Sequence, residues 1–307
     1  MTEPASPHPV SNIPEGSFPL GGTPTARIGY GMSRIALMAE TAENRASAVA
    51  LLRTARELGV THFDTAQFYG DDRANQLLRE SFAGVRDDIV IATKVGVKLV
   101  SGAPVPLEAA QKPGELRVAV EENLRTLGTD RVDIVNLRRM DFTPGLVAEG
   151  SQIVSFEDQL AEMVSLRDEG KILSIGLSHV TIEQLRTALP LGVACVQNMY
   201  SLVRCDDEPL LSLCEKHGIA WVPYFPLGGG FGTLPKVADE RIVADVAERL
   251  GATPSQVGLA WQLAHSPNTM VIPGTSSIDH LNENVEAGAV QLDAGSIAEL
   301  DALAQPA

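Results

Sequence analysis

Short apolar segments alternate along most of the chain with longer segments in which apolar residues recur every three or four positions. The first kind is typical of buried β-strands and the second of amphipathic helices. In one of the longer segments, Leu116, Val120 and Leu124 share a single stripe of a helix. The apolar segments predict strands at residues 28–32, 60–64, 89–94, 132–137, 173–178, 194–198, 219–224 and 269–273.

The segments between these strands predict helices, and several of them end at a glycine just before the next strand. Gly59, Gly170 and Gly218 occupy this place, where a residue with positive φ terminates the last helical turn. The expected helices span residues 43–59, 72–84, 113–128, 156–170, 181–190, 208–218, 239–251, 253–266 and 277–287. Each strand is therefore followed by at least one helix that can cover it.

The predicted strands lack the alternation of an antiparallel sheet with one face in water, which favours parallel strands covered by helices. Eight strand-helix units in roughly 270 residues match the (β/α)8 TIM barrel, which is typically about 250 residues long. A doubly wound open sheet is the alternative, but no G-x-G-x-x-G motif follows the first strand. We therefore expect an α/β fold of the TIM-barrel type.

The segments before the first strand predict two further features. Residues 1–15 are rich in Pro and Ser and poor in apolar side chains, which indicates a disordered arm. Residues 17–30 contain two short extended segments around Gly21 and Gly22, which predict a β-hairpin at the bottom of the barrel. We expect residues 16–307 to form a single catalytic barrel domain.

Composition excludes several classes of function. The chain has 307 residues, with 24 Lys and Arg against 39 Asp and Glu and a formal charge of −15. This acidity excludes an electrostatic nucleic-acid binder, because phosphates need clustered cations. Three cysteines are too few for a disulfide framework, and no segment is typical of a signal peptide or a membrane span. We expect a cytoplasmic protein without membrane partners that is a monomer or a weak homo-oligomer.

Polar residues cluster at the predicted strand ends, where the active sites of (β/α)8 barrels lie. They are Asp64, Tyr69, Lys94, Arg138, Ser178, His179, Gln197, Asn198, Tyr224 and Thr275. Because side chains alternate along a strand, Asn136 and Arg138 share one face, which must point inward if Val135 packs against helices. The barrel mouth is therefore the expected place for chemistry.

Three of these residues together can donate a proton to a developing alkoxide. A phenol such as Tyr69 has a reference pKa of about 10 and donates near neutral pH only if its phenolate is stabilised. The Lys94 ammonium can stabilise it, and the Asp64 carboxylate keeps the lysine charged. Proton donation is half of a carbonyl reduction. The other half is a hydride, which no side chain supplies, so a nicotinamide cofactor is required.

Ordered motifs over most of the chain resemble the aldo-keto reductase family. The similar segments are FDTAQFYG, IVIATKVG, RVDIVNLRRMD, GKILSIGLSH, VQNMYSL, GIAWVPYFPLGGG and IPGTSSIDHLNEN, and the likeness extends from about Gly21 to Glu286. The resemblance implies a (β/α)8 barrel that binds NADPH across its C-terminal mouth without a Rossmann fold. The sequences NLRR and IPGTSSIDHLNEN are most similar to those of a bacterial branch of the family that includes pyridoxal reductases.

The resemblance implies a role for each matching residue. Tyr69 is the expected general acid, Lys94 lowers its pKa, and Asp64 is the counter-ion of the lysine. Arg138 takes the place of the fourth catalytic residue. The expected cofactor-binding residues are Ser178, His179, Gln197, Tyr224, Phe225, Pro226, Leu227, Gly228, Gly230, Gly274, Thr275, Ser276, His280, Glu283 and Asn284.

The chain departs from the family pattern at the nicotinamide end of the expected site. Arg138 stands where the family usually has a histidine, and a guanidinium can orient a carbonyl oxygen but cannot relay protons. Carbonyl reduction should survive this change better than alcohol oxidation. His179 replaces the usual asparagine beside Ser178, and Phe225 occupies a position often held by serine.

The chain also departs from the pattern at the adenosine end. Gly274 and His280 stand where many members have a lysine and an arginine for the 2′-phosphate. The expected preference for NADPH over NADH therefore depends on Thr275, Ser276 and His280. The glycine-rich segment at residues 228–232 is either a flexible loop or, as is typical after the seventh strand of a barrel, a phosphate-binding loop.

Single residues also allow structural interpretations. Asp64 alone could cap a turn and Lys94 alone could be an ordinary strand-end cation, but their combination with Tyr69 at strand ends favours catalysis. Arg138 could instead form an ion pair with Asp141 or another carboxylate. The triad is therefore the firmer hypothesis, and the role of Arg138 stays open at this point.

We expect an NADPH-dependent enzyme that reduces an aldehyde or ketone to an alcohol, with NADH as the less favoured cofactor. The expected substrate is an aromatic or heteroaromatic aldehyde such as pyridoxal, and a specialised ketone reductase of a biosynthetic pathway is the alternative. A redox-sensing module that binds NADPH with little turnover is a second alternative, against which the intact triad argues. A metal-dependent hydrolase is disfavoured because His62 and Asp64 lack further ligands at the strand ends, so we expect no metal site and a core role for His62.

Overall fold

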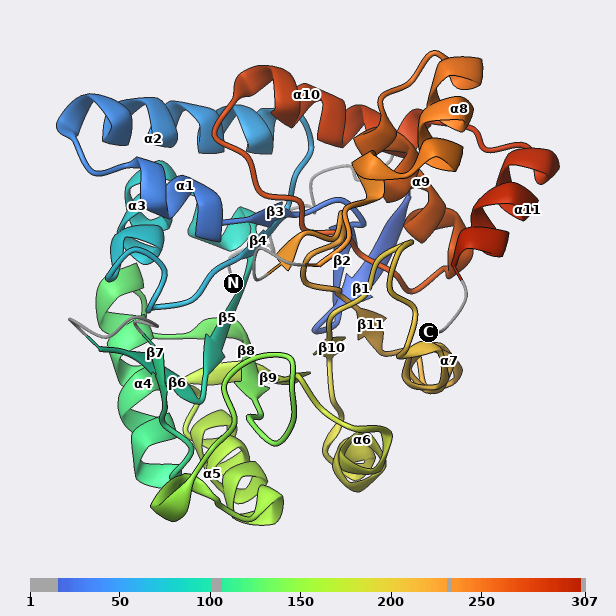
Figure 1. The fold of residues 1–307 in the computed structure, drawn as a ribbon. Helices are drawn as coiled ribbons and strands as arrows, with labels where there is room; N and C mark the ends of the chain where they lie inside the picture. The colour runs from blue at the N-terminus through green and yellow to red at the C-terminus, as the bar shows by residue number, and fades with distance from the viewer. Residues whose placement is uncertain (1–15, 101–106, 231–233, 305–307) are drawn as a thin grey trace, which may run out of the picture.

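A curled parallel sheet forms the centre of the computed structural model, which describes residues 16–100, 107–230 and 234–304 (Figure 1). Within these ranges seven strands pair in the order β3-β4-β5-β8-β9-β10-β11, and each neighbouring pair is parallel. The strands are β3 (Tyr30–Gly31), β4 (His62–Asp64), β5 (Val90–Val95), β8 (Val132–Arg138), β9 (Ile172–Ser178), β10 (Cys195–Gln197) and β11 (Ala220–Trp221). The expected arm at residues 1–15 lies outside the described residues.

The sheet closes on itself through the segment around Val271. Thr269 bridges Trp221 of β11, and Val271 bridges Ile28 just before β3, both in parallel orientation. The Gly29 amide donates to the Val271 carbonyl over 2.8 Å. The predicted eighth strand therefore lies between β11 and β3 and closes the barrel, although it forms isolated bridges instead of a regular ladder. The predicted (β/α)8 barrel is confirmed.

The predicted N-terminal hairpin consists of β1 (Ser17–Leu20) and β2 (Thr23–Ala26), which pair antiparallel. Leu20 is 1% exposed and packs inside the barrel in one cluster with Val90 and Cys195, the first residues of β5 and β10. The hairpin therefore closes the N-terminal end of the barrel, as predicted, and the C-terminal end is left for a site.

Helices surround the sheet on its outer side (Figure 1). They are α2 (Ala42–Glu57), α3 (Arg73–Ser81), α4 (Pro113–Leu127), α5 (Phe156–Asp168), α6 (Ile182–Ala188), α7 (Glu208–Lys216), α8 (Arg241–Leu250), α9 (Pro254–His265) and α10 (Ile278–Glu286). Short 3-10 helices lie at η1 (Arg86–Asp88), η2 (Gly150–Gln152), η3 (Leu189–Leu191), η5 (Val237–Asp239) and η6 (Ala287–Ala289). The helices agree with the predicted spans to within a few residues.

Polar side chains cap the start of several of these helices, and glycines follow the end of several. Thr41, Thr181 and Thr253 each accept a hydrogen bond from the amide three residues further on, a cap worth about 1 kcal/mol. Gly170 and Gly218 follow α5 and α7 with φ of 77° and 64°. The predicted role of these glycines is confirmed, because only glycine adopts such φ values without strain.

Some elements of the described chain were not predicted by the apolar pattern. These are α1 (Ser33–Met38), the hairpin of β6 (Val97–Leu99) and β7 (Leu107–Ala109), and α11 (Ala294–Leu303). The first three are too short for periodicity to show, and the apolar residues of α11 form no clear stripe. Strand β11 stops before Pro223, earlier than predicted, because proline has no amide to donate to a ladder.

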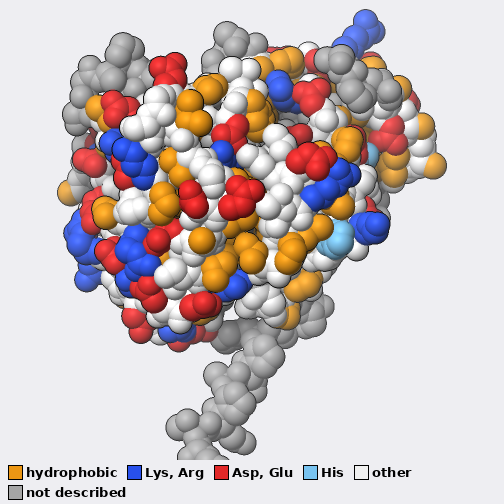
Figure 2. Space-filling view, turned by 90° about the horizontal axis from the view of Figure 1, so that it is seen from below, with side chains coloured by type: hydrophobic (Ala, Val, Ile, Leu, Met, Phe, Trp, Pro, Cys, Tyr) orange, Lys and Arg blue, Asp and Glu red, His pale blue; other side chains and the backbone are white. Residues whose placement is uncertain are grey.

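The surface combines charges of both signs. Figure 2 shows acidic and basic side chains interspersed with apolar ones over the face it displays. Exposed ion pairs such as Lys171 with Glu121 and Arg249 with Glu299 hold neighbouring elements together but contribute little to stability. None of the helices in the described ranges is long and apolar enough to cross a membrane.

Candidate active site

A cavity of about 940 Å³ opens at the C-terminal ends of the strands. Among the predicted site residues it is lined by Asp64, Tyr69, Lys94, Arg138, Tyr224, Phe225, Pro226, Leu227, Gly228, Gly274, Thr275, His280, Glu283 and Asn284. These residues come from five different strand ends and their following loops or helices. The barrel brings them to one mouth because parallel strands all end on the same side.

The other predicted residues lie beside this cavity and not in its described lining. They are Ser178, His179, Gln197, Gly230 and Ser276. Gly230 lines a second cavity of about 190 Å³, and a Cβ there would lie 2.4 Å from the Phe225 ring. Ser276 is exposed next to the cavity residue Thr275.

Asp64 and Lys94 form a buried ion pair at the floor of the cavity. Each is 3% exposed, and the Lys94 ammonium donates to one Asp64 oxygen and, over 3.1 Å, to the Thr65 carbonyl. The second Asp64 oxygen accepts a hydrogen bond of 2.6 Å from the Gln197 amide. Both carboxylate oxygens are therefore occupied, which compensates for burial of the charge.

Tyr69 lies next to this ion pair. It follows β4 in a turn, where its amide donates to the Ala66 carbonyl over 3.0 Å and its ring packs edge-on against Phe68 at 5.1 Å. The Lys94 nitrogen is 5.2 Å from the centroid of the Tyr69 ring. Burial by itself lowers the pKa of Lys94, but attraction to Asp64 and Tyr69 outweighs it, so this pKa lies above its ordinary value. Lys94 is therefore a permanent cation beside the phenol at neutral pH.

Ser178 and Gln197 present unpartnered polar atoms below the cavity. Both side chains are fully buried. Within the described residues the Ser178 hydroxyl and the Gln197 side-chain carbonyl have no hydrogen-bond partner. Buried polar groups left unpaired cost about 1–3 kcal/mol each, so such atoms at the edge of a cavity are candidates to bind a polar ligand group.

His179 is bound to other parts of the protein through both ring nitrogens. Its Nε2 lies 2.9 Å from the Phe142 carbonyl, and its Nδ1 lies 2.9 Å from the Tyr224 hydroxyl. Burial lowers the pKa of His179, so the ring is neutral at neutral pH. A carbonyl only accepts, so Nε2 carries the proton and Nδ1 accepts from Tyr224. The ring of His179 also stacks on Phe142 at 4.0 Å, and it therefore fixes the orientation of Tyr224.

Arg138 has no ion pair with Asp141, contrary to one of the two interpretations of the sequence. The neighbouring Arg139 takes both oxygens of that carboxylate, at 2.8 and 2.6 Å. Arg138 instead lines the cavity, with its guanidinium carbon 5.5 Å from the centroid of the Tyr224 ring. The inward face predicted from strand alternation is confirmed for Asn136, whose side-chain oxygen accepts a hydrogen bond from the thiol of Cys195, a residue of the same interior cluster as Leu20.

The opposite end of the cavity is formed by the segment that leads into α10. The Thr275 side chain accepts from the Ser277 amide over 3.1 Å, and the Thr275 carbonyl accepts from the Tyr30 hydroxyl. One cation on this side was not predicted: Arg34 of α1 lines the cavity close to Gly274. The sequence pattern does not indicate it, because α1 is short and nothing in the local pattern marks its first residues.

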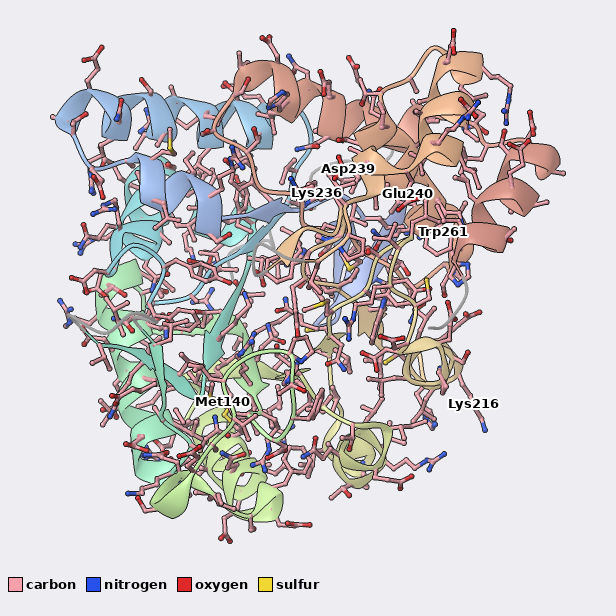
Figure 3. The ribbon with its side chains drawn as sticks, viewed as in Figure 1. Met140, Lys216, Lys236, Asp239, Glu240 and Trp261 are labelled. Carbon is pink, nitrogen blue, oxygen red and sulfur yellow. The ribbon has the colours of Figure 1, made fainter. Side chains whose placement is uncertain are left out.

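An apolar wall was also missed. Phe68, Val97, Met140 and Leu146 belong to a small cluster separate from the main core, and all four line the cavity. Figure 3 labels Met140, which lies in the loop after β8. Part of this wall comes from the unpredicted hairpin of β6 and β7. The sequence carried no signal for it beyond scattered apolar residues in loops.

His62 lies in the barrel interior below Asp64, as expected of a core histidine. It is fully buried, neither ring nitrogen has a partner within the described chain, and burial lowers its pKa to about 4. The part of the chain that the structure describes contains no group of three or more His, Cys, Asp or Glu residues placed to hold a metal ion.

Comparison with known proteins agrees with this architecture. The sequence model of the Aldo/keto reductase family matches residues 27–305. The chain is 39% identical over 292 residues to pyridoxine 4-dehydrogenase of Escherichia coli (strain K12), covering 94% of this chain and 98% of the relative. It is 33% identical over 304 residues to an uncharacterized oxidoreductase of Schizosaccharomyces pombe, covering 98% and 94%.

Solved structures give the same result. An aldo-keto reductase from Klebsiella pneumoniae, crystallised in complex with NADPH, superimposes with a TM-score of 0.78 at 27% identity, covering 95% of this chain and 96% of that one. The chain belongs to the aldo/keto reductase family of oxidoreductases.

Proposed function

We propose that this protein reduces an aldehyde or ketone to an alcohol with NADPH as the hydride donor. The observation that carries the proposal is the contact between Tyr69 and the buried Lys94–Asp64 pair at the floor of an open cavity. A phenol beside a permanent cation gives up its proton more readily, because the cation stabilises the phenolate. Tyr69 would then be the general acid that protonates the carbonyl oxygen, an effect worth about 10²–10⁴-fold in rate.

The residues around the cavity fit a dinucleotide. The cofactor supplies a hydride, which no side chain can provide. The unpartnered Ser178 hydroxyl and Gln197 carbonyl could bind an amide group, and the Tyr224 ring offers a flat apolar face. A cavity of about 940 Å³ lies at the upper end of ligand-site volumes and leaves room for a substrate beside the cofactor.

The remaining predicted residues would hold the phosphates. Leu227 and Gly228 follow β11 and line the cavity, where the lack of a side chain at Gly228 lets an anion approach the backbone closely. At the other end, Thr275 and His280 line the cavity together with Arg34. Preference for NADPH over NADH would depend on this group, because the extra phosphate of NADPH needs donors and positive charge.

For the substrate we propose an aromatic or heteroaromatic aldehyde. The wall formed by Phe68, Val97, Met140 and Leu146 provides apolar surface for a flat ring. The 39% identical relative is named for the oxidation of pyridoxine, a ring-bearing alcohol, which supports pyridoxal as a first compound to test. A ketone of comparable shape remains the competing substrate class.

Substitution of Tyr69 by phenylalanine tests the proposed reaction. We expect NADPH consumption with pyridoxal or benzaldehyde to fall by about 100-fold or more, since one general acid contributes at least that much. Binding of NADPH, measured by quenching of tryptophan fluorescence, should stay within a factor of two or so of the wild type because the phenol does not hold the cofactor. Undiminished turnover in Tyr69→Phe would remove the phenol from the mechanism, and a wild-type protein that binds no NADPH would refute the function.

A further inference from the structure

Two adjacent arginines at the end of β8 have opposite surroundings. Arg139 is 7% exposed, and its guanidinium donates to the Asp141 carboxylate, the Gln159 side chain and the Val154 carbonyl. Arg138 is half-buried in the cavity wall, and its guanidinium has no hydrogen bond or ion pair with any described residue. The guanidinium of Arg139 is therefore fully hydrogen-bonded within the protein, and the N–H donors of Arg138 are available to a ligand.

The guanidinium of Arg138 makes a cation-π contact with Tyr224. Its guanidinium lies over the Tyr224 ring at 5.5 Å, and its Nη2 atom is 4.0 Å from where a Cβ of Gly145 would lie. The Tyr224 ring is itself oriented by the 2.9 Å hydrogen bond between its hydroxyl and His179. A cation-π contact does not use the N–H groups as hydrogen-bond donors, so the donors of the guanidinium stay available to an acceptor.

No carboxylate in the described lining of the cavity neutralises this guanidinium. The acidic residues there are Asp64 and Glu283. Asp64 is occupied by Lys94 and Gln197. Glu283 belongs to α10, which follows the segment around Val271, and the strand order places that segment across the barrel from β8. One positive charge therefore remains uncompensated at the Arg138 end of the cavity.

We propose that Arg138 binds an anionic oxygen of the substrate, so that the site selects carbonyl compounds with an ionised hydroxyl or a carboxylate next to the carbonyl group. This inference rests on the carbonyl reduction proposed above. A planar guanidinium matches such an oxygen and the neighbouring carbonyl with parallel N–H donors. The anionic oxygen can belong to an ionised hydroxyl or to a carboxylate. The apolar wall that includes Phe68, Met140 and Leu146 favours the hydroxyl, in an aromatic aldehyde that carries it ortho to the aldehyde group.

The charge of Arg138 should give a measurable preference for anionic over neutral substrates. Hydrogen bonds to charged groups contribute about 1.5–3 kcal/mol. At 1.4 kcal/mol per factor of ten, about 2 kcal/mol corresponds to a preference of about 30-fold for the anionic compound over a neutral one of the same shape. A guanidinium that only fills space would give no such preference.

The first test compares 2-hydroxybenzaldehyde with 2-methoxybenzaldehyde as substrates of the full-length protein with NADPH, at a pH where the hydroxyl group is ionised. In Arg138→Met, kcat/KM for the hydroxy compound should fall about 30-fold more than kcat/KM for the methoxy compound. Arg138→Lys should restore part of the difference because it keeps the charge. Phenylglyoxylate, a 2-oxo acid, distinguishes the two anion sources: a larger effect of Arg138→Met on this compound would assign the carboxylate instead.

The second test requires no turnover. Benzoate and benzamide are titrated calorimetrically into the protein saturated with NADP⁺. We expect Arg138→Met to weaken benzoate binding by about 30-fold and to leave benzamide and NADP⁺ binding unchanged. Arg241→Met on α8 is the matched control, because that side chain is 94% exposed and lies outside the described lining of the cavity.

Equal losses for the charged and neutral compounds in Arg138→Met would overturn the inference and leave carbonyl reduction standing. Benzoate binding that is insensitive to Arg138→Met would overturn it as well. A wild-type protein that neither binds NADPH nor reduces any of these compounds would overturn both the inference and the proposed function. The three results are distinct, so the two proposals fail separately.

Discussion

Replacing Asp64 by asparagine tests whether the Lys94 ammonium depends on its counter-ion. Both side chains are 3% exposed, and the two form an ion pair at the cavity floor. Removing one partner of a buried pair leaves the other charge without compensation and costs about 3–5 kcal/mol. We expect the free energy of unfolding of Asp64→Asn to fall by that amount. Activity should fall by about 100-fold or more, because a lysine that loses its charge no longer stabilises the Tyr69 phenolate.

The pH dependence of the free energy of unfolding shows whether the charge of Lys94 stabilises or destabilises the folded protein. In the wild type the pKa of Lys94 is raised, so its contribution to stability is complete below the pKa of an unfolded lysine, about 10.4, and is lost only above it. In Asp64→Asn, only Tyr69 still opposes burial, which is the largest cause, so we expect the pKa of Lys94 in the folded state to fall below that of the unfolded chain. The unfolded chain then binds the extra proton, so the stability of the variant should rise between neutral pH and about pH 10.

Urea unfolding followed by tryptophan fluorescence measures both effects, because Trp221 and Trp261 are buried in the described core. The double variant Asp64→Asn/Lys94→Met is the control. It removes the buried charge as well as the counter-ion, so it should be more stable than Asp64→Asn alone while remaining inactive. A loss of less than about 1 kcal/mol in Asp64→Asn, with stability independent of pH, would refute the reasoning, since this is the scale of an exposed pair.

Two further predictions concern the ends of the barrel. Leu20→Ala should lower the free energy of unfolding by about 2–5 kcal/mol, because Leu20 is 1% exposed and fills the N-terminal end of the barrel. The kinetic constants of the enzyme should be unchanged. A loss below about 1 kcal/mol in urea unfolding would contradict the role of Leu20 in closing this end. Arg34→Gln should weaken NADPH binding several-fold at low salt and less at high salt, because Arg34 is an exposed cation beside the cavity. Salt-independent fluorescence titrations that match the wild type would exclude a contact with phosphate.

The two ends of this barrel have separate tasks. The N-terminal end is filled by the apolar plug around Leu20, and the hairpin that carries it makes no contribution to the lining of the main cavity. The C-terminal end carries the buried charges and the unpartnered polar atoms, which cost stability. Burial of apolar surface at one end offsets the cost of charges at the other, which is the usual relation between a core and a site.

The positions of Asp64, Tyr69 and Lys94 followed from the sequence because the local pattern is strong there. Asp64 and Lys94 end apolar segments long enough to be recognised as strands, and strand ends of a parallel barrel meet at one mouth. Arg138 was located in the same way. The sequence did not predict which of the two neighbouring arginines pairs with Asp141. Packing decides this: Arg139 binds the carboxylate, and Arg138 lies over the Tyr224 ring instead.

Hydrophobic periodicity and turn residues specify the barrel, its N-terminal hairpin and many of the residues at its mouth, because these signals act over a few positions and repeat eight times. The tertiary structure alone decided the apolar wall around Met140, the cation Arg34 and the bond from His179 to Tyr224. These contacts join residues far apart in the chain through short loops that carry no periodicity. Their geometry depends on how the closed sheet places each loop, which no local pattern encodes.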